Sequence, residues 1–196
     1  VGGAGNVACN ISAIGGIANL VAVTGDDLAG SQINNLLDDD QGVINSLIVG
    51  NDYATTVKTR FVADGQHLLR VDDESIDIYS AQFRESIFST VEALLGQEPP
   101  GAIVLSDYGK GVLSGSITKN IITAAKLLNI PVIIDPKGTD YSKYYGADIL
   151  TPNRKELSES SLLPTRTSDQ IVAAAENLID RFAIGSVLVT RGKEGM

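Results

Sequence analysis

Four short segments carry charged side chains directly after apolar runs of strand length: residues 106–111, 135–138, 151–156 and 190–195. Lys110, Lys137 and Arg191 are among their side chains, and most of the segments also contain glycine or proline. Each segment alone has the composition of an ordinary solvated turn. Together they place cations where a phosphate group could be bound. The pattern therefore favours a site for a phosphorylated small molecule.

The elements that would position these segments alternate along the chain. Helical patterns are predicted at 6–14, 27–37, 81–95, 117–128 and 169–182, and strands at 20–23, 102–105, 132–134, 149–150 and 186–190. Short apolar strands separated by amphipathic helices predict a mostly parallel sheet with helices on both faces, a three-layer α/β/α arrangement. Ligands of such sheets bind at the carboxyl ends of the strands, where the four segments lie.

Residues 43–73 have a different character from the rest of the chain. Residues 55–62 are rich in β-branched side chains, residues 66–71 can pair back on them, and Asp64-Gly65 is a two-residue hairpin signal. We expect a small β-sheet inserted into the core, so that 1–42 begin the core, 43–75 form the insert and 76–196 continue the core. A two-residue turn would place Arg60 and Arg70 on opposite faces unless a bulge changes the register.

Composition limits the classes of function. With 196 residues, of which 43% are hydrophobic and 20% charged, the chain has the makeup of one globular domain. Its net charge of −9 disfavours nucleic acid as a partner. No apolar stretch is long enough for a membrane span. One cysteine and one histidine support neither an internal disulfide nor a zinc site. A cytoplasmic protein is the expectation.

The opening glycines allow two interpretations. Residues 3–8, Gly-Ala-Gly-Asn-Val-Ala, match the G-x-G-x-x-A dinucleotide fingerprint, and Asp26 lies about 20 residues further on. The acidic residue of that fingerprint should directly end the second strand, whereas Thr24-Gly25 intervene here. A dinucleotide-binding module is thus an alternative that this motif alone leaves open.

A longer pattern over the same region includes Gly2, Gly3 and Asn6, followed by Gly15 and Gly25. It resembles the N-terminal signature of the ribokinase-like (PfkB) sugar kinases. The resemblance continues in an N-x-x-E motif at residues 153–156 and a T-x-G-x-x-G motif at residues 190–195. It therefore covers nearly the whole chain and implies an ATP-dependent kinase with a β-sheet lid over the sugar.

The resemblance also implies roles for individual residues. It assigns the sugar to Gly2, Gly3 and Asn6. It assigns the nucleotide to the two later motifs, at Asn153, Arg154, Lys155, Glu156, Thr190, Arg191, Gly192 and Gly195. Glu156 would act on Mg²⁺ through water. ATP as co-substrate, Mg²⁺ and a homodimer formed through the lid are further expectations from the family.

Within this family, residues 105–111, 135–140 and 189–191 most resemble the heptose-phosphate kinases. That resemblance implies conversion of D-glycero-β-D-manno-heptose 7-phosphate to the 1,7-bisphosphate for lipopolysaccharide precursors, with a ribose or fructose kinase as the alternative. Lys110 and Lys137 would bind the sugar phosphate or its neighbouring hydroxyls, Asp107 joins the substrate-binding set, and Arg60 or Arg70 would reach in from the lid.

The catalytic base is not assigned to any residue of this sequence. The family carries it on an aspartate in a G-A-G-D turn, and these residues contain no such motif. Asp26, Asp107 and Asp135 are better interpreted as turn or capping residues than as substitutes. We therefore expect a chain that lacks the first strand and the catalytic region of the family.

Overall fold

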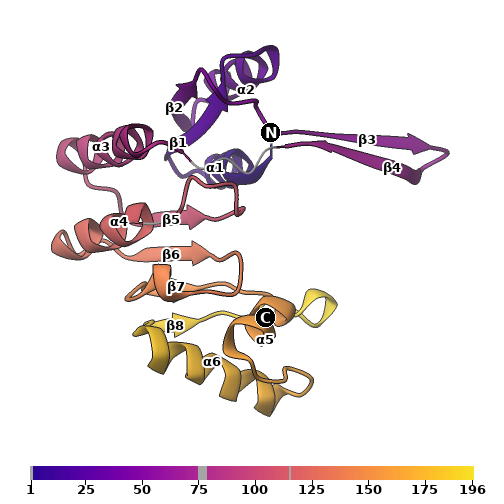
Figure 1. The fold of residues 1–196 in the computed structure, drawn as a ribbon, viewed down its shortest axis with the longest axis vertical. Coiled ribbons are helices and arrows are strands. Elements are labelled where there is room, and N and C mark those ends of the chain that lie inside the picture. The colour runs from indigo at the N-terminus through magenta and orange to yellow at the C-terminus, as the bar shows by residue number, and fades with distance from the viewer. Residues whose placement is uncertain (1, 75–78, 115) are drawn as a thin grey trace. The chain divides into compact units, whose positions relative to one another are not determined.

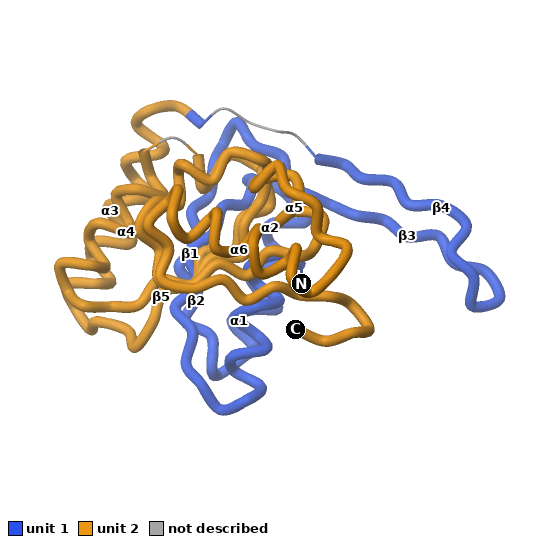
Figure 2. The backbone as a smooth tube through the Cα atoms, turned by 90° about the horizontal axis from the view of Figure 1, so that it is seen from below, with its two compact units in different colours: residues 1–79 blue, residues 80–196 orange. Residues whose placement is uncertain are grey.

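The computed structural model describes residues 2–74, 79–114 and 116–196. The chain divides into two compact units, Val1–Tyr79 and Ser80–Met196 (Figure 2). The expected end of the β insert, at residue 75, falls outside the described residues. Within the described residues, no helix combines the length and the apolar character that crossing a membrane requires.

The first unit contains a parallel strand pair flanked by two helices. Helix α1 (Gly3–Ala13) leads into strand β1 (Ala18–Gly25), and helix α2 (Leu28–Asp38) leads into strand β2 (Val43–Gly50). The two strands pair in parallel from Ala18 opposite Val43 to Gly25 opposite Gly50. Side chains from all four elements form a common core, with Ala8, Leu20, Leu37 and Val43 buried.

The boundary that the sequence suggested for the β insert is wrong at its beginning. Residues 43–50 form β2, which pairs in parallel with β1 and so belongs to the α/β body. The antiparallel pairing begins only at Val57. Composition could not separate the two parts, because β2 and the first hairpin strand, β3, are both rich in β-branched residues.

An aspartate at the start of α2 connects this body to the segment that precedes the hairpin. The Asp27 carboxylate accepts hydrogen bonds from the Gly30 amide and the Thr55 amide, each at 2.7 Å. The Thr55 hydroxyl in turn accepts from the Gly25 amide at 2.9 Å. The Thr55 and Gly30 hydrogen bonds lower the pKa of Asp27, so the carboxylate is held in its ionised form.

The hairpin consists of β3 (Val57–Ala63) and β4 (Gln66–Asp73), and it extends as a two-stranded arm (Figure 1). The turn at Asp64-Gly65 is confirmed: both residues have positive φ, 49° and 76°, as a type I′ turn requires. A bulge shifts the register between Phe61 and Val62. Arg60 therefore lies directly opposite Arg70, and the expectation that the two arginines face opposite sides is wrong.

This register gives the hairpin two chemically different faces. Strand alternation places Lys58, Arg60, Arg70 and Asp72 on one face. Lys58 and Arg70 both form ion pairs with Asp72, at 2.9 and 2.8 Å. The other face carries exposed apolar side chains, namely Val57, Phe61, Leu69 and Val71.

The second unit contains a four-stranded sheet with every neighbouring pair parallel. The strands are β5 (Ile103–Ser106), β6 (Val132–Asp135), β7 (Ile149–Leu150) and β8 (Ser186–Val187), in the order β5-β6-β7-β8. The helices are α3 (Ala81–Gln97), α4 (Ser116–Leu127), α5 (Arg154–Ser161) and α6 (Ser168–Phe182). Short 3₁₀ turns, η1 (Ser142–Tyr144) and η2 (Gly192–Glu194), complete the unit. The alternation predicted from the sequence is thus present.

Two details of the second unit differ from the sequence prediction. Helix α5 was not expected, because its sequence is polar and lacks an apolar stripe. The predicted strand 186–190 is shorter, ending at Val187, although Thr190 makes an isolated parallel bridge to Asn153. The interior between the sheet and these helices is apolar, with Ile134, Leu150, Leu157 and Leu178 fully buried.

Candidate functional site at the carboxyl ends of the strands

The four charged segments of the second unit lie along one edge of its sheet. Backbone hydrogen bonds join the ends of neighbouring strands and the segments that follow them: Asp107 N–H to Asp135 O at 3.0 Å, Thr151 N–H to Ile134 O at 2.9 Å, and Thr190 N–H to Pro152 O at 3.0 Å. Residues separated by more than 80 positions in the sequence are therefore held along one edge.

Asp107 occupies a buried position immediately after β5. Its side chain is only 4% exposed. One carboxylate oxygen, Oδ1, accepts from the Gly109 amide at 2.7 Å. The other, Oδ2, accepts from the Lys143 ammonium and from the Tyr144 hydroxyl, each at 2.6 Å. Both oxygens are thus engaged with protein donors, and Asp107 shapes the loop that carries Lys110.

Gly109 makes this loop possible. Its φ of 66° lies in the left-handed region, which glycine adopts without the steric penalty of a side chain. The bond from its amide to Asp107 Oδ1 then closes a tight turn after the strand. Lys110, the lysine expected to bind substrate, follows directly and is partly exposed.

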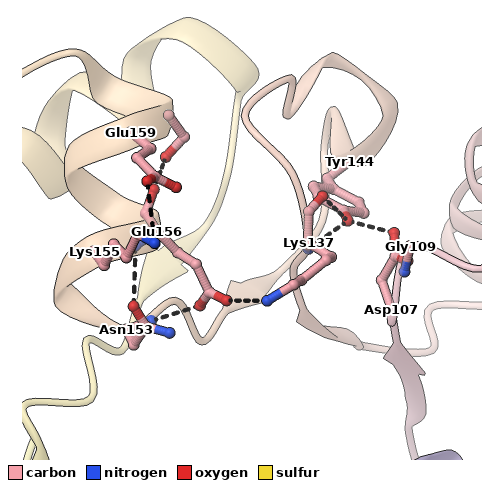
Figure 3. Close-up of polar contacts among 9 residues, drawn as sticks. Asp107, Gly109, Lys137, Tyr144, Asn153, Lys155, Glu156 and Glu159 are labelled. Carbon is pink, nitrogen blue, oxygen red and sulfur yellow. Dashed lines mark hydrogen bonds and ion pairs between the residues drawn. The ribbon is translucent and has the colours of Figure 1, made fainter. Parts of the chain in front are cut away.

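Lys137 extends from the loop after β6 toward the beginning of α5 (Figure 3). Its ammonium lies 3.1 Å from Glu156 Oε1. Glu156 Oε2 accepts from the Asn153 amide at 3.0 Å, while Asn153 Oδ1 accepts from the Glu156 amide at 3.0 Å. The last two bonds form a capping box at the N-terminus of α5. The N-x-x-E motif is therefore also a helix start, and its glutamate bridges two strand-end loops.

Asp135 lies between these two networks. Loss of hydration makes the largest contribution to the raised pKa of Asp135, and the negative charge of Glu156 raises this pKa further. Lys137 acts in the opposite direction and Asp107 adds a smaller increase. The carboxylate is exposed at the sheet edge, and the surrounding protein atoms and like charges raise its pKa above the ordinary value without removing its charge at neutral pH.

The two middle residues of the N-x-x-E motif, Arg154 and Lys155, have different partners. The Arg154 guanidinium donates to the carbonyl oxygens of Thr165 and Arg166 and lies 3.3 Å from Glu194 Oε2. It thereby ties the start of α5 to two other loops. Lys155 is largely exposed and lies 3.7 Å from Glu159, one helical turn further on.

The last segment forms a compact turn after β8. The Arg191 amide donates to the Gly195 carbonyl at 2.8 Å, and the Arg191 guanidinium contacts the carbonyls of Glu194 and Met196 at 3.4 Å. Gly192 and Gly195 both have positive φ, 62° and 81°. Thr190 lies beside Asn153 through its bridge, so the T-x-G-x-x-G and N-x-x-E motifs are neighbours in space.

The first unit carries the remaining predicted substrate-binding residues. Gly2 caps the N-terminus of α1 without a side chain, and Gly3 opens the helix with a φ of 56°. Asn6 is exposed on the same helix. Arg60 and Arg70 share one face of the hairpin. The substrate roles of these residues stay predictions.

The described residues contain no group of three or more histidine, cysteine, aspartate or glutamate side chains arranged to hold a metal ion. Both Glu156 oxygens already accept hydrogen bonds from protein groups. This donor set does not fit direct coordination of Mg²⁺, which takes six oxygen ligands, but it is compatible with contact through water.

A parallel sheet with cationic loops at the carboxyl ends of its strands is typical of α/β proteins that bind phosphorylated small molecules there. Sequence comparison identifies the particular family. The pfkB family carbohydrate kinase model matches residues 1–196, and the chain belongs to this family of phosphotransferases. The match over the whole chain favours the kinase interpretation of the opening glycines over the dinucleotide-binding alternative.

A curated relative from Rhodospirillum rubrum, "Bifunctional protein HldE", is 45% identical over 196 residues. The alignment covers 100% of this chain but only 39% of the relative. The chain therefore corresponds to about two-fifths of the length of that protein.

Solved structures give the same fold. The tetrameric inhibited form of phosphofructokinase-2 from Escherichia coli matches with a TM-score of 0.78 at 24% identity, covering 99% of this chain and 63% of the other. Arabidopsis thaliana ribokinase complexed with ribose and ATP matches with a TM-score of 0.66 at 26% identity, covering 96% of this chain and 59% of the other. The ribokinase-like α/β fold is confirmed.

Sequence reasoning missed Lys143 and Tyr144, which contact Asp107 from η1. No motif marks them, because they lie inside the connection between β6 and β7 and not at a strand end. The capping function of Asn153 and Glu156 did have a signal, since an N-cap residue followed three positions later by glutamate is a helix-start pattern.

The charge environment of Asp135 predicts a pH-dependent stability. A raised pKa means that the folded protein binds this proton more tightly than the unfolded chain does. The free energy of unfolding therefore decreases as the pH rises from the ordinary value of 3.8 through the raised pKa. Asp135→Asn should unfold at higher urea concentration than the parent at pH 7, and the difference should shrink as the pH approaches 3.8.

Asp140→Asn is the matched control, and its effect on stability at pH 7 should be opposite in direction to that of Asp135→Asn. Hydrogen bonds from the Ser142 backbone and side chain lower the pKa of Asp140, so its charge stabilises the fold above the ordinary value and its removal should lower the urea midpoint at pH 7. Tyrosine fluorescence can follow both, since the chain has six tyrosines and no tryptophan. If Asp135→Asn and the parent had the same urea midpoint at pH 7 as well as near pH 3.8, the raised pKa of Asp135 would be contradicted.

Proposed function

We propose that this chain forms part of an ATP-dependent kinase whose acceptor is a phosphorylated sugar, and specifically D-glycero-β-D-manno-heptose 7-phosphate. The observation that carries the proposal is the cationic edge of the second unit, where Lys110 and Lys137 follow adjacent parallel strands in a protein of net charge −9. Membership of the pfkB family supports phosphoryl transfer, and the sequence resemblance described above supports the heptose phosphate.

In this proposal the lysines neutralise the phosphate that the sugar already carries. A phosphate group prefers charge-assisted hydrogen bonds, and Lys137 is half exposed while already paired with Glu156. An incoming phosphate can therefore compete for the ammonium without a large change in the loop. Gly2, Gly3 and Asn6 are the residues proposed to contact the sugar hydroxyls, with Arg60 as a further phosphate ligand.

Arg60 is the better of the two hairpin arginines for that role. Arg70 forms an ion pair with Asp72 at 2.8 Å. Within the described part of the chain, no ion pair of Arg60 is found, although the bulge places it on the same charged face. A guanidinium without a carboxylate partner can bind phosphate without first losing an ion pair.

The nucleotide is proposed to lie near the N-x-x-E and T-x-G-x-x-G motifs, which are neighbours in space. ATP brings Mg²⁺, which neutralises the phosphate oxygens during transfer. Glu156 would hold water molecules that bind the ion, and Arg191, with the backbone of Gly192 and Gly195, would contact the nucleotide. We assign no catalytic base to these residues. A cytoplasmic location accompanies the use of ATP.

We also propose that the hairpin joins two copies of the protein. Its apolar face carries Phe61 and Leu69 opposite each other, 49% and 54% exposed, with Val57 and Val71 beside them. Exposed hairpin strands with an apolar face can associate with the same face of a second copy, which satisfies the symmetry of a dimer.

The substrate proposal is tested with the full-length protein, ATP and Mg²⁺. Heptose 7-phosphate should give ADP and the 1,7-bisphosphate, whereas ribose and fructose should be turned over far more slowly because they offer no phosphate to the lysines. ADP formation is measured by a coupled assay and the product by mass spectrometry. Efficient turnover of ribose or fructose without turnover of the heptose phosphate would refute the substrate assignment.

The role of Glu156 is tested by Glu156→Gln. Glutamine can still complete a capping box, so the helix start should persist while the charge is lost. The Mg²⁺ concentration for half-maximal activity should rise about tenfold, the size of effect that residues behind a metal's own ligands commonly have. Glu159→Gln, in the same helix but outside the cap, is the control and should leave the Mg²⁺ dependence unchanged. Identical Mg²⁺ profiles for Glu156→Gln and the parent would exclude the role.

The dimer proposal is tested by Leu69→Asp. Burial of a leucine side chain contributes about 2 kcal/mol, so the charge should raise the dimer Kd by more than about tenfold. His67→Asp, an exposed change on the other face of the hairpin, is the control and should leave the Kd near that of the parent. Sedimentation equilibrium measures both. A parent protein that is monomeric at micromolar concentration, or a Leu69→Asp variant that dimerises normally, would count against this interface.

A further inference from the structure

The turn η1 contacts the two strand-end loops that carry the proposed phosphate-binding lysines. The Tyr144 hydroxyl donates to Asp107 Oδ2 at 2.6 Å, in the loop after β5. The same hydroxyl accepts from the Lys137 amide at 3.0 Å, in the loop after β6 (Figure 3). One oxygen atom therefore connects both loops.

The contact between Tyr144 and Asp107 is shielded from water. Tyr144 is fully buried, and burial together with the hydrogen bond to Asp107 raises the pKa of its hydroxyl, so the group remains a neutral donor. Lys143 supplies the compensating charge at 2.6 Å from Asp107 Oδ2, and its ammonium lies 4.9 Å from the centre of the Tyr144 ring. A buried carboxylate without these donors would be strongly destabilising.

We propose that Tyr144 and Lys143 are positioning residues for the sugar-phosphate site. Tyr144 fixes the backbone at Lys137, and with Lys143 it fixes the carboxylate of Asp107, whose other oxygen closes the turn before Lys110. The two lysines are thereby held at a set spacing along the sheet edge. The inference rests on the proposed function, because it assigns these lysines to the phosphate of the sugar.

The chain offers a matched control in Tyr141, the tyrosine that begins the same turn. Tyr141 is also fully buried, and its ring meets that of Tyr144 edge to face at 5.3 Å between centroids. Within the described residues its hydroxyl makes no hydrogen bond, although the nearby Ser160 lowers the pKa that burial raises. Tyr141→Phe thus removes a buried hydroxyl that does not link the two loops.

The experiment compares Tyr144→Phe with Tyr141→Phe in the full-length protein. Tyr144→Phe should raise the KM for heptose 7-phosphate about threefold to tenfold, the factor that corresponds to one hydrogen bond, and leave the KM for ATP unchanged. Its Lys137 amide should exchange with solvent faster, because its acceptor is gone. Tyr141→Phe should change neither quantity.

Lys143→Met and Lys143→Arg provide a second pair, so the test survives if one variant folds poorly. Methionine should raise the sugar-phosphate KM, and arginine, which keeps the charge, should restore it. Unchanged exchange at Lys137 in Tyr144→Phe, or faster exchange with an unchanged KM, would overturn the positioning role. If the parent phosphorylates no sugar phosphate, the proposed function fails, whereas the exchange comparison still decides whether Tyr144 fixes the Lys137 loop.

Discussion

Parallel pairing forces the strands β5 to β8 to end at one edge of their sheet, and every contact in the candidate site depends on that alignment. Ser106 pairs with Asp135 at the ends of β5 and β6, so the next residues, Asp107 and Pro136, begin their loops side by side. The bridge between Asn153 and Thr190 does the same for the two motifs that follow β7 and β8. Side chains distant in sequence can then share a hydrogen-bond network without any long connection of their own.

The cations of this edge are balanced by nearby carboxylates. Lys143 is paired with Asp107, and Lys137 with Glu156. The buried pair is held on several sides and is suited to fixing structure, whereas the half-exposed Lys137 forms a weaker contact that an incoming anion can replace. Asp135 adds negative charge near this edge. That charge repels an incoming anion unless the anion forms strong hydrogen bonds or ion pairs with the lysines. Under the proposed function, such an edge would favour a doubly charged phosphate over weaker anions.

The alternation of helices and strands, the Asp64-Gly65 turn and the location of the charged segments were predictable, because each depends on local patterns. The limits of the hairpin were not, since pairing decides whether a β-rich segment joins a parallel or an antiparallel neighbour, and residues 43–50 joined β1. Helix α5 depends on its capping box and not on an apolar stripe. Tyr144 was undetectable, because its contact with Asp107 spans 37 residues and is created only by the tertiary fold.

The hairpin shows how a single residue can decide the chemistry of a surface. Without the bulge near Phe61, the two-residue turn would put Arg60 and Arg70 on opposite faces and mix cations with the apolar side chains. With it, Lys58, Arg60, Arg70 and Asp72 gather on one face, and Val57, Phe61, Leu69 and Val71 gather on the other. One strand pair can therefore present a charged surface suited to an anion and an apolar surface suited to another copy of the chain. Because side chains alternate along a strand, a deletion that removed the bulge would change both surfaces at once, so the proposed phosphate contact and the proposed dimer contact depend on the same register.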